Sequence, residues 1–212
     1  SDFAGYSTTA IGVALALGFG LPDNFCYPYA SIGFSDFWRR WHISLSSWLR
    51  DYLYIPIGGN RTGNLRTYAN LMTTMLRGGL WHGASWTFGV WGGVPGLYRA
   101  AERWLRARVG HWPGWNTVMM QILLALLTYA LVNITWVFFR ADDFAAAWRM
   151  IDTMLTFEMD GAVVLPPILM IQTVVTIGIM LICHWYMRNR KLDKVIGSLP
   201  TWVTGLCWGA LI

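Results

Sequence analysis

A histidine inside a glycine-rich, apolar stretch is the first residue in this sequence that suggests chemistry. His82 lies in the run GGLWHGASW, residues 78–86, and the chain has only three other histidines. Histidine suits proton transfer near neutral pH, because its ordinary pKa is about 6.5. The flanking glycines allow a substrate or another backbone to come close. His82 is therefore a candidate general base, and a neutral core histidine that is hydrogen-bonded across helices is the structural alternative.

A second histidine, His42, lies in a tryptophan-rich segment. Apolar side chains recur there at helical spacing and polar ones fall on the opposite face, which predicts one amphipathic helix over residues 34–50 at the membrane interface. On this periodicity alone, a histidine that faces lipid head groups is favoured over a chemical role, and Arg39 and Arg40 suit contacts with lipid phosphates equally well. The apolar face comprises Phe34, Phe37, Trp38, Trp41, Leu45 and Trp48, and the polar face Ser35, Arg39, His42, Ser46 and Arg50.

The composition indicates that lipid is the solvent of this chain. Hydrophobic residues make up 55% of it and charged residues only 13%, against roughly a quarter charged residues in a soluble domain. Uncharged stretches long enough to cross a bilayer, which takes about 20 helical residues, predict four or five crossings or re-entrant segments. They cover residues 3–22, 78–98, 109–139, 161–187 and 195–212. His82 then lies at membrane depth, where an ionisable residue is a functional-site candidate by default.

The elements that must position these histidines are predicted to be helices. The span after His82 has glycines four apart, which allow two helices to touch closely, so we expect it to pack against the His82 segment. The fold class is therefore all-α: a polytopic membrane protein whose residues 1–212 form a single membrane-embedded region, the C-terminal part of a longer chain. Helices are predicted over residues 67–80, 115–139, 142–157 and 168–187, with a polar turn over 58–64.

Charge and cysteine content restrict the possible partners. The net charge of +5 comes from basic residues in short segments between apolar runs, at 39–66, 99–108 and 188–194. This distribution is typical of cytoplasmic loops of membrane proteins and favours a membrane surface over nucleic acid. The three cysteines include no CxxC pair and predict neither a disulfide framework nor a metal site. Asp2 is either a buried carboxylate that orients a histidine or a helix-start residue.

Several long motifs resemble the signature of the membrane-bound O-acyltransferase family, and in particular its alginate O-acetylase branch. They are FWRRWHISLSSWLRDYLYI at 37–55, GGNR at 58–61, GGLWHGASW at 78–86, DFAGYS at 2–7 and TWVFFRA at 135–141. Two positions depart from that branch: Thr8 replaces an aspartate, and Val94-Pro95-Gly96 replaces a further histidine before glycine.

This resemblance implies helices around a central tunnel in a bacterial inner membrane, with O-acetylation of an exported polysaccharide such as alginate as the reaction. It implies that His82 is catalytic, with His42 as the second histidine of the site. The acyl donor is acetyl-CoA or an acyl carrier that enters from the cytoplasm, and no cofactor is bound. A periplasmic or extracellular acetyltransferase partner completes the transfer. Residues expected to bind substrate or line the tunnel are Asp2, Arg39, Trp81 and Asn60.

Three alternatives stay open at the level of sequence. A sister branch with the same histidine motifs transfers D-alanine to teichoic acid. A transporter, in which His82 relays protons and the glycine-rich span gates a pore, also fits broken membrane helices. In the third alternative, the chain is an inactive scaffold for a partner acetyltransferase. Binding of a thioester donor distinguishes the enzymes from the transporter.

Overall fold

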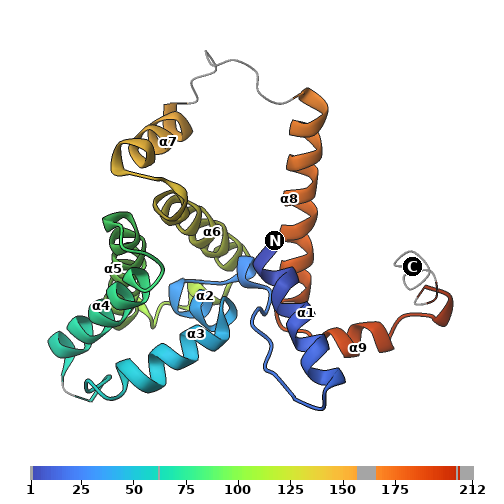
Figure 1. The fold of residues 1–212 in the computed structure, drawn as a ribbon, viewed down its shortest axis with the longest axis horizontal. Helices are drawn as coiled ribbons and strands as arrows, with labels where there is room; N and C mark the ends of the chain where they lie inside the picture. The colour runs from blue at the N-terminus through green and yellow to red at the C-terminus, as the bar shows by residue number, and fades with distance from the viewer. Residues whose placement is uncertain (1, 62, 157–165, 204, 206–212) are drawn as a thin grey trace. The chain divides into compact units, whose positions relative to one another are not determined.

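The computed structural model describes residues 2–61, 63–156, 166–203 and 205, and over these residues the regular structure is helical (Figure 1). The predicted all-α class is confirmed. The chain divides into two compact units, Ser1–Val164 and Leu165–Ile212. The first unit contains α1 (Asp2–Ala16), α2 (Phe34–Arg40), α3 (Ile43–Trp48), α4 (Asn64–Leu80), α5 (Trp86–Val109), α6 (Val118–Arg140) and α7 (Phe144–Thr156), with short turns of helix at Pro28–Ala30, Leu49–Tyr54 and Pro113–Asn116. The second contains α8 (Pro167–Met187) and α9 (Leu192–Gly197).

Within the described residues, two helices are long and apolar enough to cross a membrane, α6 and α8. Both were predicted from their uncharged runs. The stretch 3–22 forms the shorter α1, which has 15 residues where a crossing needs about 20. The stretch 78–98 is not a single span, because α4 ends at Leu80 and the Ser85 hydroxyl caps α5 by accepting the Thr87 N–H over 3.3 Å. Part of the predicted span 195–212 lies outside the described residues.

Helices α4 and α5 cross in direct backbone contact, as their glycines predicted. A Cβ added to Gly92 would overlap the carbonyl oxygen of Met75 and lie 2.9 Å from the Cα of Gly79. One turn further on, a Cβ on Gly96 would lie 2.8 Å from the sulfur of Met72. Small residues at such a crossing permit close packing and weak Cα–H···O contacts in place of side-chain contacts. The α4–α5 pair thereby brings the turn that carries His82 against the first half of α5.

An aromatic core joins α2 to α5 and α6. Helix α2 runs antiparallel to α5, since Phe34 stacks near Tyr98 at a centroid distance of 4.4 Å and Trp38 near Trp91 at 6.2 Å. At the start of α2, the Glu102 carboxylate accepts the Ser35 N–H over 2.9 Å. The buried members of the core are Phe34, Phe37, Trp38, Met75, Trp91 and Val132.

The predicted single helix over residues 34–50 is wrong. The structure divides it into α2 and α3 at His42, whose φ of 48° is left-handed. Backbone hydrogen bonds from an earlier segment stabilise this break: Cys26 N–H donates to the Arg40 carbonyl over 2.8 Å, and Ile43 N–H donates to the Asn24 carbonyl over 3.0 Å. These partners satisfy backbone groups that a continuous helix would have paired internally.

The glycine crossing predicts a sharp difference between two alanine substitutions on α5. We expect Gly92→Ala to lower the free energy of unfolding of the full-length protein by about 1–3 kcal/mol, because the added methyl group forces two backbones apart. Gly89→Ala is the matched control, since a Cβ there would meet Leu80 at an ordinary 3.6 Å. Thermal unfolding in detergent measures both. Equal melting temperatures for the two variants would contradict the crossing.

Candidate functional site

The imidazole of His42 is held by the side-chain amide of Asn24. Its Nδ1 lies 3.3 Å from Asn24 Oδ1, and the same oxygen accepts the Ser44 N–H over 3.1 Å and the Ser44 hydroxyl over 3.0 Å. The amide nitrogen of Asn24 donates to Ser7 Oγ over 3.4 Å, which links the amide to α1. The ring also packs edge-on against Phe3, at a centroid distance of 4.7 Å.

This arrangement assigns the tautomer of His42. A backbone N–H can only donate, so the oxygen that accepts from Ser44 N–H is correctly placed as an acceptor. We therefore assign the proton of His42 to Nδ1, because the nearer of its two polar neighbours, Asn24 Oδ1 at 3.3 Å, can only accept, and Ser44 Oγ lies at 3.5 Å. The Nε2 of His42 is then the unprotonated, basic nitrogen.

His42 is also kept neutral. Burial, and to a smaller extent the nearby ring of His82, lowers the pKa of His42 to about 4. Its polar partner Asn24 is a neutral amide, which does not favour the charged imidazolium as a carboxylate does. At pH 7 the His42 imidazole is therefore uncharged.

His82 lies in the tight turn between α4 and α5, surrounded by aromatic rings. The ring centroids of Trp81, Trp91 and Phe139 lie 5.0, 4.9 and 5.6 Å from that of His82. The backbone N–H of His82 donates to the Gly79 carbonyl over 3.0 Å, which fixes the turn. Its Nε2 is buried and has no hydrogen-bond partner among the described residues. A buried polar atom without a partner is a position where a substrate group can bind.

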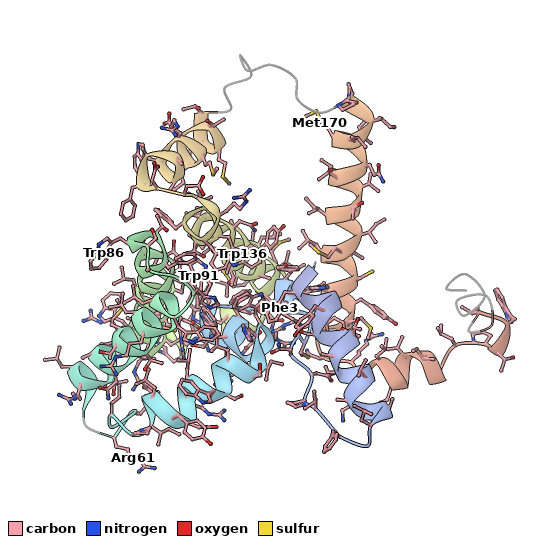
Figure 2. The ribbon with its side chains drawn as sticks, viewed as in Figure 1. Phe3, Arg61, Trp86, Trp91, Trp136 and Met170 are labelled. Atoms are coloured by element: carbon pink, nitrogen blue, oxygen red, sulfur yellow. The ribbon has the colours of Figure 1, made fainter. Side chains whose placement is uncertain are left out.

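Tryptophans connect the two histidines. Trp41 lies 5.6 Å from His42 and 6.3 Å from Trp91, which in turn lies 4.9 Å from His82. Figure 2 shows Trp91 and Trp136 among the helices of this core, whereas Trp86, which is 76% exposed, points away from it. The structure thus brings His42 and His82 to one aromatic cluster, although 40 positions separate them in sequence.

The remaining predicted site residues are more dispersed. Trp81 packs edge-on against His82 while most of its surface is exposed. Arg39 lies exposed in the last turn of α2, three positions before His42. Asn60 lies in the turn after Leu49–Tyr54, where it accepts a hydrogen bond from the Tyr54 hydroxyl. Asp2 begins α1, and its side chain lies outside the described residues.

Sequence reasoning missed the groups that orient the histidines. Asn24 and Ser44 hold His42, and Trp91 and Phe139 enclose His82. A polar Asn24 directly after a long apolar segment was a weak signal. Nothing in its spacing pointed to a histidine 18 positions away.

Comparison with known proteins agrees with the motifs. The model of the membrane-bound O-acyltransferase family matches residues 1–139, which include both histidines. The chain belongs to the membrane-bound O-acyltransferase family. This confirms the resemblance found in the sequence, and together with α6 and α8 it makes the chain part of a membrane protein.

Relatives in this family include O-acetylases and D-alanyltransferases. The chain is 49% identical over 156 residues to "Probable alginate O-acetylase AlgI" of Azotobacter vinelandii, which covers 74% of the chain and 30% of that protein. It is 44% identical to the "Peptidoglycan O-acetyltransferase" of Helicobacter pylori, covering 73% of the chain and 29% of that protein. The "Teichoic acid D-alanyltransferase" of Streptococcus thermophilus is 34% identical, over 50% of the chain and 28% of that protein. The chain therefore spans about 30% of the length of these relatives.

The contact between Asn24 and His42 predicts the charge and the tautomer of the His42 ring in this O-acyltransferase family member. We expect ¹⁵N NMR of histidine-labelled full-length protein to show a neutral His42 ring, protonated on Nδ1, down to about pH 5, one unit above the pKa of about 4. Asn24→Asp should raise this pKa, because a carboxylate favours the imidazolium. His42→Asn assigns the signal, since asparagine tolerates a left-handed backbone. A titration midpoint near 6.5 in the unsubstituted protein would contradict the assignment.

Proposed function

We propose that the full-length protein transfers acetyl groups from a thioester donor to an acceptor hydroxyl, for O-acetylation of an exported polysaccharide such as alginate, with His82 as the general base. The buried, unpartnered Nε2 of His82 carries this proposal, because it is an imidazole nitrogen with an unfilled hydrogen-bond position inside an aromatic cluster. An acceptor hydroxyl that donates to this nitrogen becomes a better nucleophile. General bases contribute about 10²–10⁴-fold to rate in such reactions.

The proposed step is a balanced acyl transfer. The acceptor oxygen attacks the thioester carbonyl of the donor while His82 takes the hydroxyl proton. The carbon–sulfur bond then breaks, and the thiolate leaves with the proton that the histidine returns. The acceptor gains an ester and the donor becomes a free thiol. His42, with its basic Nε2, supports the site as a second neutral imidazole in the same cluster.

Donor, membrane and partners follow from the same proposal. The donor is acetyl-CoA or an acyl carrier on the cytoplasmic side, where the basic segments are expected to lie. A tunnel through a multi-pass protein of the bacterial inner membrane, lined in part by Asp2, Arg39, Trp81 and Asn60, leads the acyl group across. An acetyltransferase partner in the periplasm or outside the cell passes it to the polysaccharide.

D-alanyl transfer is the second candidate reaction. Its support is the relative from Streptococcus thermophilus and the teichoic acid D-alanyltransferase of Bacillus subtilis, which is 50% identical over 54 residues and covers 26% of the chain. The O-acetylases match at 44–49% identity over 73–74% of the chain. The longer match favours acetyl transfer.

His82→Ala tests the proposal in cells that carry the full-length protein. At matched membrane abundance, we expect acetylation of the exported polysaccharide to fall by at least about 100-fold, because the general base is lost. His111→Ala is the matched control, since His111 is exposed after the end of α5 and should leave acetylation unchanged.

Two other results would change the assignment. Unchanged acetylation in His82→Ala would reject the catalytic histidine and return the chain to a transporter or a scaffold for a partner enzyme. Loss of D-alanine from teichoic acid, with acetyl groups unaffected, would select the second reaction.

A further inference from the structure

A half-buried arginine on α5 lacks a carboxylate partner in an ion pair. The Nε of Arg99 is fully enclosed and has no hydrogen-bond partner among the described residues. Its Nη1 reaches only the sulfur of Met75, over 3.8 Å, which is a weak acceptor. Burial lowers the pKa of the Arg99 guanidinium. A buried cation is stable only when an anion or several strong acceptors compensate for its lost hydration.

Two further arginines lie near Arg99. Arg103 follows it by four positions on α5 and so lies on the same helix face. Arg39 follows Ser35 by four positions on α2, and Ser35 contacts Glu102, so the antiparallel packing brings Arg39 beside Arg99. Burial is the main cause of the lowered pKa of Arg99; Tyr54 and Glu102 oppose this shift, and the charge of Arg39 adds to it.

The Tyr54 side chain borders these arginines, since the positive charges of Arg103 and Arg99 oppose the rise in its pKa that burial causes. Its single hydroxyl proton is donated to the Asn60 side chain, so Tyr54 adds no donor for an anion. We call Arg39, Arg99 and Arg103 the arginine cluster.

The carboxylate beside the arginine cluster is already engaged. Glu102 accepts the Ser35 N–H over 2.9 Å and forms an ion pair with Arg106 over 2.7 Å. Asp36, the acidic residue of α2, pairs with Arg40 over 2.9 Å. Within the described part of the chain, Arg39, Arg99 and Arg103 therefore have no carboxylate in an ion pair, and the cluster has an excess of positive charge.

We propose that the arginine cluster binds a phosphate ester. Guanidinium groups match phosphate oxygens with paired N–H donors, and several arginines can share one phosphate. The source that fits its position is the phosphate of a pantetheine-bearing acyl donor, an assignment that rests on the proposed function. Arg39 is on α2, which ends two residues before His42, and Arg99 is on α5, which carries Trp91 beside His82. A donor whose phosphate binds the cluster can extend its thioester along α2 and α5 toward the histidines.

Binding of coenzyme A to the purified full-length protein tests this site separately from catalysis. In a His82→Ala background, we expect Arg99→Gln and Arg39→Gln each to weaken coenzyme A binding by about tenfold or more in calorimetry, since each removes a charge-assisted contact. Pantetheine, which lacks the phosphates, should bind all variants equally. Arg108→Gln is the matched control, because Arg108 instead stacks on Trp104, 4.4 Å from its ring centroid. Arg39 is exposed, so its variant tests the site even if Arg99→Gln fails to fold.

A second experiment distinguishes a lipid phosphate from the phosphate of the acyl donor. Thermal stability is compared in nanodiscs of zwitterionic lipid with and without phosphatidylglycerol. If Arg99→Gln and Arg39→Gln abolish a stabilisation by phosphatidylglycerol and leave coenzyme A binding intact, the site holds a phosphate ester of lipid and the donor assignment is overturned. If neither ligand distinguishes these variants from Arg108→Gln, the phosphate site itself is overturned. If His82→Ala loses acetylation but binds coenzyme A normally, this result supports His82 as the general base and does not test the phosphate site.

Discussion

The backbone contact between Gly79 and Gly92 is the constraint on which the rest of the site depends. Because neither residue has a Cβ, α4 and α5 approach closely enough for a turn of only a few residues to join them. That turn carries His82, and the close approach brings its ring within 4.9 Å of Trp91. A bulkier pair would separate the helices and move His82 away from the tryptophan that also contacts Trp41.

The two histidines are both uncharged imidazoles, but different contacts surround them. His42 is oriented by a neutral amide and lies in a half-buried aromatic environment, so burial favours the uncharged ring and the amide adds no negative charge that would oppose it. His82 is enclosed by rings, and its Nε2 has no polar partner in the described structure. Burial lowers the pKa of His82 as well, so both imidazoles are uncharged at pH 7.

Sequence predicted those features that depend on local pattern and not those that depend on distant contacts. Helices α4 and α6–α8 follow directly from periodicity and uncharged length, and the glycine crossing follows from spacing. The break at His42 did not follow, because its hydrogen-bond partners lie in the segment around Asn24 and only the folded chain brings them together. The same reason explains why both histidines were found from composition while Asn24 and Phe139, which orient and enclose them, were not. Family motifs added the pairing of His42 with His82, which no periodicity indicated.

The glycine crossing also has a consequence for motion. At the contact between Gly79 and Gly92 no side chain lies between the two backbones, so close packing fixes the separation of α4 and α5 there. The wall of the His82 site formed by Trp91 is therefore fixed to His82 itself. Phe139 comes from the end of α6, a separate helix, and contacts the same ring from another side. A displacement of α6 would therefore move Phe139 relative to His82 while leaving Trp91 in place.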